Sequence, residues 1–185
     1  MKIGLLGLQG AFRDHIPHLQ RCGVQPIVVR AEEKLAAVDR LILPGGESTV
    51  MAKFIREFGL LAPLRKRLAA GMPTWGICAG AILLAEWVDG TPGLLQALPI
   101  RVTRNAYGRQ RESRLHPVRV PLFGENDYPA IFIRAPRIDD MNDDVAVRAC
   151  DAATPVFIQY GRVMATTFHP ELNGDNKFHR YFLSI

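Results

Sequence analysis

The feature that most constrains the fold is an alternation of short apolar runs with helical patterns in the first half of the chain. The apolar runs are rich in Leu, Ile and Val and end at Gly, Pro or polar residues, which is typical of buried strands: 2–6, 25–29, 40–43 and 73–77. Helical patterns separate and follow them at 11–22, 32–38, 49–58, 63–70 and 79–87. We expect Ser48 to cap the helix over 49–58. Strands and helices in this order predict a parallel sheet that is covered on both faces.

The second half of the chain has a different pattern. Short strand candidates with turns between them occur at 100–104, 117–120, 130–134, 145–149, 156–160 and 163–168, and a last helix is expected near 175–183. The predicted fold is therefore α/β, a three-layer sandwich with a mainly parallel central sheet, helices on both faces and an antiparallel addition in the second half. A length of 185 residues fits one domain spanning 1–185.

Composition limits the partners and the cellular compartment. The three cysteines, Cys22, Cys78 and Cys150, show no C-x-x-C spacing, so we expect no metal, no disulfide framework and a reducing cytoplasm. We also expect no membrane segment and no signal peptide. The net charge of +5 comes partly from arginines between Arg101 and Arg119, a stretch with the single aromatic Tyr107. This pattern lacks the interleaved stacking residues of nucleic-acid binders, and we expect no nucleic acid.

The most specific chemical motif is Gly76-Ile77-Cys78-Ala79-Gly80, a G-x-C-x-G pattern at a predicted strand-to-helix junction. This is the cysteine form of a nucleophile elbow, in which a tight turn exposes the reactive side chain. The start of the following helix favours a thiolate at this position. Cys78 is therefore the predicted nucleophile, whereas we expect Cys22 and Cys150 to be structural.

A base for this nucleophile is offered by His169-Pro170-Glu171, directly after a predicted strand. Residues i and i+2 of an extended segment point the same way, so Glu171 can hold His169 in one tautomer. This is the logic of a Cys-His-acid triad. The other histidines, at positions 15, 18, 116 and 179, lack an acid at this spacing, and we expect surface or packing roles for them.

A third motif, Pro44-Gly45-Gly46-Glu47-Ser48, follows another predicted strand and is compatible with a phosphate loop, a helix-capping turn or an oxyanion-hole loop. It lacks the lysine of a Walker loop, so nucleotide binding has little support. An oxyanion hole needs two N–H donors. The amide of Ala79 can supply one, and an amide of the Gly45–Gly46 loop can supply the other.

Together these residues resemble the triad glutaminases of the class I glutamine amidotransferases, and in particular the glutaminase subunits of pyridoxal 5'-phosphate synthase. Five motifs in the expected order carry the resemblance along nearly the whole chain: Gly7-Leu8-Gln9-Gly10, Leu43 to Thr49, Arg104-Asn105-x-x-Gly108-Arg109-Gln110, Phe132-Ile133-Arg134-Ala135-Pro136 and Phe168 to Leu172. The resemblance implies hydrolysis of L-glutamine to L-glutamate and ammonia through a thioester, without a cofactor. It also implies a synthase subunit as partner in a hetero-oligomeric complex.

The resemblance also implies the site residues. The catalytic residues would be Cys78, His169 and Glu171, and the oxyanion hole would be formed at Gly46 and Ala79. Glutamine would be bound by Gly46, Glu47, Ser48, Arg104, Ile133 and Arg134. Arginine suits the substrate carboxylate and glutamate suits its ammonium group.

Other interpretations remain open at this point. The same glutaminase could serve a different ammonia-using synthase, such as one making histidine precursors. The chain could also be a cysteine hydrolase or a chaperone-like protein of the related α/β superfamily, although Glu171 and the glutamine-binding set speak against this. A regulatory subunit that retains an inactive triad is the non-enzyme alternative.

Overall fold

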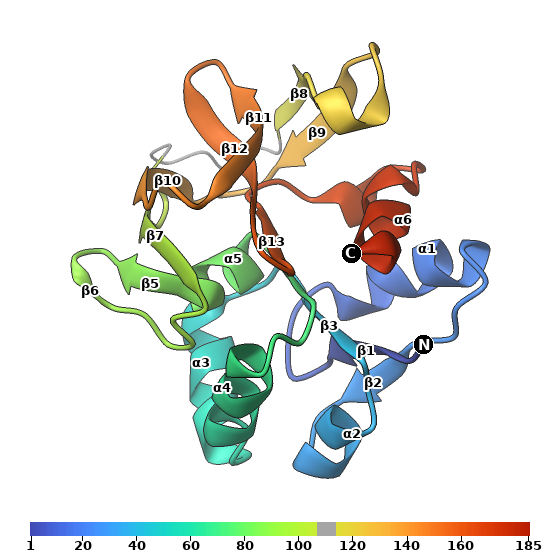
Figure 1. The fold of residues 1–185 in the computed structure, drawn as a ribbon, viewed down its shortest axis with the longest axis vertical. Helices are drawn as coiled ribbons and strands as arrows, with labels where there is room; N and C mark the ends of the chain where they lie inside the picture. The colour runs from blue at the N-terminus through green and yellow to red at the C-terminus, as the bar shows by residue number, and fades with distance from the viewer. Residues whose placement is uncertain (107–113) are drawn as a thin grey trace.

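The fold is built around a seven-stranded mixed sheet with the strand order β11-β12-β13-β4-β3-β1-β2 (Figure 1). The computed structural model describes residues 1–106 and 114–185. Five neighbouring strands are parallel: β2 (Ile27–Val29), β1 (Ile3–Leu6), β3 (Arg40–Leu43), β4 (Thr74–Ile77) and β13 (Val163–Thr166). The strands β12 (Thr154–Tyr160) and β11 (Ala146–Asp151) extend the sheet in antiparallel fashion. The predicted α/β class and the antiparallel addition are therefore confirmed.

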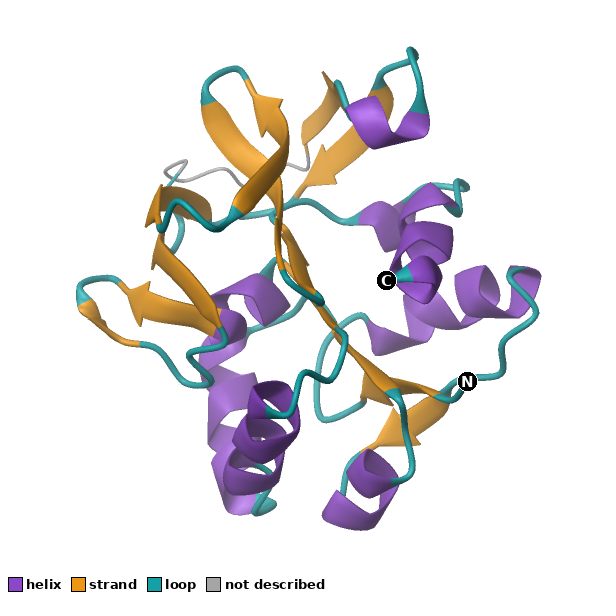
Figure 2. Ribbon diagram, viewed as in Figure 1, coloured by secondary structure: helices purple, strands orange, loops and turns teal. Residues whose placement is uncertain are grey.

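Helices cover both faces of this sheet, as Figures 1 and 2 show. One face packs against α2 (Glu32–Ala36), α3 (Ser48–Glu57), α4 (Leu61–Ala69) and α5 (Ala79–Leu84). The other face packs against α1 (His15–Arg21) and α6 (Lys177–Ser184). Successive residues of β3 point to opposite faces, so Leu41 and Leu43 enter the first core and Ile42 enters the second. This two-sided burial explains why the parallel strands read as continuous apolar runs.

Two smaller sheets lie outside the central one. The first has the order β10-β7-β5-β6, built from β5 (Ala85–Val88), β6 (Thr91–Pro92), β7 (Leu98–Thr103) and β10 (Arg137–Met141). The second pairs β8 (Arg114–Val118) with β9 (Tyr128–Phe132). Short 3-10 turns complete the described elements: η1 (Phe12–Asp14), η2 (Pro121–Phe123) and η3 (Pro170–Leu172).

Two local predictions are wrong. The helix expected over 79–87 ends at Leu84, and the chain continues as β5 because Trp87 and Val88 pair with β6 and β7. Sheet pairing therefore overrides helical periodicity here. The cap of α3 is Glu47, not Ser48: Glu47 is extended and its carboxylate accepts a hydrogen bond from the backbone N–H of Thr49.

The topology brings the chemical motifs to one edge of the sheet. The loops that follow β1, β3, β4 and β13 all leave from the carboxyl ends of parallel strands, which is where ligands bind in open α/β sheets. Within residues 1–106 and 114–185 there is no helix long and apolar enough to cross a membrane.

Candidate active site

Cys78 lies in a strained turn between β4 and α5. Its φ of +48° and ψ of −98° are outside the conformations that non-glycine residues usually adopt, and such strain is common at functional sites. The flanking glycines are required sterically. A Cβ on Gly76 would come within 2.6 Å of the Leu84 side chain, and one on Gly80 would come within 2.1 Å of the Leu43 carbonyl oxygen. The G-x-C-x-G pattern therefore folds into the tight strand-to-helix turn that the predicted elbow requires.

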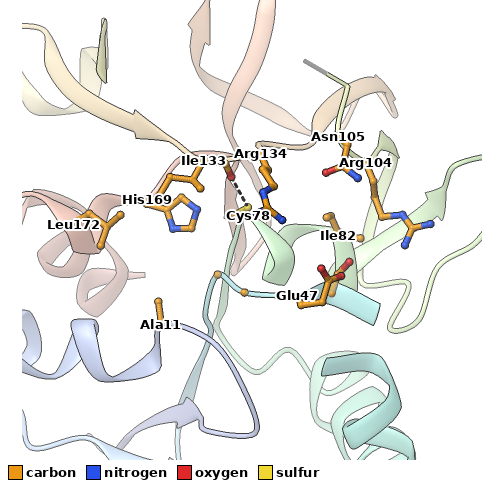
Figure 3. Close-up of a pocket in the computed structure, with 13 residues that line it drawn as sticks. Ala11, Glu47, Cys78, Ile82, Arg104, Asn105, Ile133, Arg134, His169 and Leu172 are labelled. Atoms are coloured by element: carbon orange, nitrogen blue, oxygen red, sulfur yellow. Dashed lines mark hydrogen bonds between the residues drawn. The ribbon is translucent and has the colours of Figure 1, made fainter. Parts of the chain in front are cut away.

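His169 and Glu171 form a buried hydrogen-bonded pair beside this elbow. The Nδ1 of His169 lies 2.7 Å from Oε1 of Glu171, and the two residues are only 6% and 4% exposed. The backbone N–H of His169 donates to the carbonyl of Ile131 at 2.8 Å, which ties the loop after β13 to β9. Because Nδ1 donates to the carboxylate, Nε2 is the ring nitrogen left for the sulfur. Figure 3 shows the ring of His169 next to Cys78.

The electrostatics of the pair follow from burial and contact. Burial lowers the pKa of His169, but its interactions with Cys78 and Glu171 outweigh this and raise the pKa to about 10. Burial raises the pKa of Glu171, but the hydrogen bond from His169 and the electrostatic interactions with His15 and His169 bring it below its ordinary value. A protonated imidazole beside a sulfur favours the reactive thiolate.

The elbow opens into a cavity of about 420 Å³, drawn in Figure 3. Most of the site residues that the sequence predicts line this cavity: Gly46, Glu47, Ser48, Cys78, Arg104, Ile133, Arg134 and His169. Glu171 lies behind His169 and does not line it. Ala79 is buried at the start of α5, where its N–H has no acceptor within the helix. The cavity is therefore an open chamber in front of the sulfur, with the acid of the predicted triad behind it.

The glycine loop after β3 is fixed against the loop after β1. The Gly45 carbonyl accepts a hydrogen bond from Ala11 N–H at 3.0 Å, and Glu47 N–H donates to the side-chain oxygen of Gln9 at 2.9 Å. A Cβ on Gly45 would lie 2.4 Å from the His169 ring. The loop thus packs directly against the predicted base. Because the 45–46 peptide is trans, the Gly46 N–H points away from Ala11 N–H.

The charged residues of the cavity are held to different degrees. Arg104 donates from Nε to Asp89 at 2.6 Å, and its backbone N–H donates to the same carboxylate at 2.9 Å. Figure 3 shows its guanidinium pointing away from Cys78, whereas the side chain of Arg134 extends toward the sulfur. Arg134 also has a φ of +44°, a conformation that is uncommon for a non-glycine residue. The sequence alone predicts the same glutamine-binding role for both arginines.

Further residues line the cavity without having been predicted: Ala11, Ile82, Asn105 and Leu172. Asn105 follows Arg104 in a motif that the sequence singles out, so position in that motif could have indicated it. Gly108, Arg109 and Gln110 of the same motif lie outside the described residues. In the part of the chain that the structure describes, no three His, Cys, Asp or Glu side chains are grouped as metal ligands would be.

The fold and the cysteine elbow define a class I-type glutamine amidotransferase. A solved glutamine amidotransferase superposes with a TM-score of 0.91 at 42% identity, covering 98% of this chain and 97% of that chain. The structure of PurLQS from Thermotoga maritima shares the fold alone, with a TM-score of 0.72 at 20% identity over 99% of this chain and 97% of that chain.

Sequence comparison narrows the class to one family. The model of the SNO glutamine amidotransferase family matches residues 5–185, and the chain belongs to this family. It is 46% identical to the pyridoxal 5'-phosphate synthase subunit PdxT of Herpetosiphon aurantiacus over 100% of both chains. It is 45% identical to the PdxT subunit of Thermotoga sp. (strain RQ2), over 100% of this chain and 99% of that protein.

Proposed function

We propose that this chain hydrolyses L-glutamine to L-glutamate and ammonia with a Cys78–His169–Glu171 triad, and that it supplies the ammonia to a pyridoxal 5'-phosphate synthase subunit. The observation that carries the triad is the 2.7 Å bond between Glu171 and His169, with the His169 ring beside a cysteine in a strained elbow. The full-length similarity to PdxT subunits supports the synthase as the destination of the ammonia.

The first step forms the thioester. The Cys78 sulfur attacks the side-chain amide carbon of glutamine, and the carbonyl electron pair moves to the oxygen. His169 carries the proton and gives it to the amide nitrogen as the C–N bond breaks. Ammonia leaves, and the glutamyl group remains bound to the sulfur. Glu171 keeps the His169 ring in the orientation and tautomer that place Nε2 at the reacting atoms.

The second step releases the product. A water molecule loses a proton to His169 as its oxygen attacks the thioester carbon. The C–S bond then breaks, so that glutamate leaves and Cys78 is restored. Both steps pass through a tetrahedral species with a negative oxygen. The N–H groups of Ala79 and Gly46 are the proposed donors to that oxygen, and losing one such donor typically costs about 10²- to 10³-fold in rate.

Glutamine is held at its other end by the charged rim of the cavity. Arg134 extends toward the sulfur and suits the substrate carboxylate, while Glu47 suits the ammonium group. Ser48 and Ile133 complete the pocket next to Cys78. Arg104 has a lesser role, because Asp89 already neutralises its charge. Free L-glutamine is thus recognised by groups of both signs.

The proposal includes the setting of the reaction. The chain works as one domain spanning 1–185. We also propose that it acts in a hetero-oligomeric complex, because ammonia released into water would be protonated and diluted. All three cysteines are free, which suits the reducing cytoplasm that we propose as its location.

Glutamate release from L-glutamine tests the proposal, measured on the purified chain with and without a pyridoxal 5'-phosphate synthase subunit. The Cys78→Ala variant serves as the blank. We expect activity that rises with the synthase subunit and is absent from the variant. Release that is equally fast without the synthase subunit would contradict the coupling, and release by the Cys78→Ala variant would contradict the triad.

A further inference from the structure

Behind the triad, on the side away from the cavity, three histidines form a buried cluster. His15 and His18 come from α1 and His179 comes from α6, and their exposed fractions are 0%, 3% and 0%. The rings of His18 and His179 stack with centroids 4.4 Å apart. Trp75, in the strand that leads to Cys78, packs edge-on against His15 and His179. The sequence suggests only surface or packing roles for these residues.

The cluster touches the triad directly at Glu171. The Nε2 of His18 lies 3.0 Å from the backbone carbonyl oxygen of Glu171. A carbonyl can only accept, so the ring donates from Nε2. His15 lies three residues earlier on α1, and residues three apart share one face of a helix. The helix therefore places a second imidazole close to the same residue, near enough for the charge of Glu171 to act on His15.

A bond within the cluster restricts the tautomer of His15. Its Nδ1 lies 2.9 Å from Nε2 of His179, so one of these two nitrogens carries a proton and the other does not. Burial lowers the pKa of His15 to about 4 and lowers the pKa of His179 further, so both rings are neutral at pH 7. In one arrangement His15 donates and its Nε2 is bare. In the other, His179 donates and His15 carries its proton on Nε2.

Three polar atoms at this place have no hydrogen-bond partner within residues 1–106 and 114–185: Nε2 of His15, Nδ1 of His179 and Oε2 of Glu171. A buried donor or acceptor without a partner is costly, particularly when it is charged. An anionic oxygen accepts hydrogen bonds and disfavours a bare nitrogen lone pair. The carboxylate therefore favours the arrangement in which His15 carries its proton on Nε2.

We propose that His15 is a positioning residue of the triad, whose Nε2–H serves the second carboxylate oxygen of Glu171, directly or through a single water. This inference rests on the proposed function. With Oε2 held by His15 and the backbone carbonyl held by His18, the carboxylate has one orientation left, in which Oε1 accepts from His169. The group is thus fixed before glutamine binds, which is what an orienting acid requires.

The charges around His15 agree with this arrangement. Glu171 is the group that raises the pKa of His15 against burial, while His18 and His169 lower it. In turn, His15 lowers the pKa of Glu171. On the α6 side the neighbours are His179 and Asn176, the latter bonded to His18, with Arg21 on α1 beside them. Glu171 is thus the anion that His15 serves in this cluster.

A pair of substitutions separates the two ring nitrogens. In His15→Gln the amide nitrogen can occupy the position of Nε2, whereas in His15→Asn the amide reaches only the position of Nδ1. We expect the complex with the synthase subunit to keep kcat within about threefold in His15→Gln. We expect it to lose about 10- to 100-fold of kcat, with KM unchanged, in His15→Asn. A lower kcat in His15→Gln than in His15→Asn, or wild-type kcat in both, would overturn the proposal.

Two further measurements test the proposal independently of whether the single His15 variants fold well. In a Glu171→Gln background, His15→Asn should cost no additional kcat, since its effect passes through the carboxylate; an unchanged penalty would contradict this. Nitrogen NMR of the wild-type protein with ¹⁵N-labelled histidine should show His15 protonated at Nε2 and not at Nδ1. The opposite tautomer would contradict the inference about His15, even if an inactive Cys78→Ala variant supports the proposed triad. An active Cys78→Ala variant would contradict the triad and would leave the tautomer of His15 unaffected.

Discussion

The two sides of the proposed Cys78–His169–Glu171 triad are built in opposite ways. On the cavity side the polar groups lie around about 420 Å³ of open space, and the Arg134 side chain extends into it. On the rear side, imidazole rings from α1 and α6 are packed with at most 3% exposure and are hydrogen-bonded to one another and to Glu171. The difference suggests a division of roles that our proposals make explicit: the cavity side leaves space for glutamine, and the rear side holds the carboxylate that we propose orients the base.

The largest expected effect on activity is on the cavity side of the triad, at Cys78. Cys78→Ala should reduce glutamate release by the complex to background, because no thioester can form without the sulfur. Cys22→Ala and Cys150→Ala are matched controls, since both thiols are free and neither lines the cavity. Retention of the synthase subunit by Cys78→Ala in a size-exclusion experiment shows that the fold is intact. Loss of activity in either control would remove the distinction between Cys78 and the other thiols.

A smaller effect is expected where the glycine loop meets the base. In Gly45→Ala the new methyl group would lie 2.4 Å from the His169 ring, so either the loop or the ring must move. A displacement of this size costs about 10²-fold in kcat. Gly174→Ala is the control, because a Cβ there meets nothing within 4 Å. Steady-state kinetics with equal rates for the two variants would show that the contact between loop and base is unimportant.

Substrate binding should distinguish Arg134, which lines the cavity, from a nearby arginine that does not. Arg134→Met should raise KM for glutamine by about 10- to 100-fold, the cost of one lost charge-assisted hydrogen bond. Arg137→Met is a suitable control, since Arg137 is paired with Asp139 and does not line the cavity. If the two variants have the same KM, the carboxylate of glutamine is held elsewhere.

The last expected effect concerns stability and leaves activity at neutral pH unchanged, and its dependence on pH has opposite signs on the two sides. The pKa of His15 falls from 6.5 to about 4 on folding, so its contribution is present above pH 6.5 and is lost as the pH falls to about 4. The loss amounts to about 3 kcal/mol. The pKa of His169 rises to about 10, so its contribution is present below pH 6.5 and is lost as the pH rises toward 10.

Urea unfolding between pH 4 and 10 measures the free energy of unfolding on both limbs of the pH curve: the acid limb, where stability is lost below pH 6.5, and the alkaline limb, where it is lost above pH 6.5. We expect the His15→Gln variant to lose the part of the acid limb that His15 supplies and to keep the alkaline limb. We expect Cys78→Ala to weaken the alkaline limb alone, since the interaction of His169 with Cys78 is part of what raises the pKa of His169. Parallel pH curves for the wild type and both variants would contradict the assignment.

The front of the site could be read from the sequence because its signals are local. The elbow glycines, the His-Pro-Glu spacing and the Pro-Gly-Gly loop each lie within a few residues, and each follows a strand that its apolar run identifies. A parallel sheet then brings the strand ends together. The sequence also predicts the antiparallel β11 and β12, whereas it does not predict β10 or the separate sheet that contains it.

The rear of the site could not be read in this way. His15 and His179 are 164 positions apart, and no local pattern indicates that they bond to one another. The same holds for Asp89, whose pairing with Arg104 depends on how β5 and β7 align. The end of α5 at Leu84 was also set by strand pairing and not by its own sequence. Contacts between distant segments are what the sequence left unresolved.

The most direct test of the triad is to trap the glutamyl thioester. The complex with the synthase subunit is mixed with L-glutamine and quenched in acid within one turnover, and the chain is then weighed and digested for mass spectrometry. We predict that the mass of one glutamyl group is added at Cys78, and that none is found in Cys78→Ala. A glutamyl adduct on Cys22 or Cys150, or glutamate release with no adduct on any cysteine at any quench time, would contradict the mechanism.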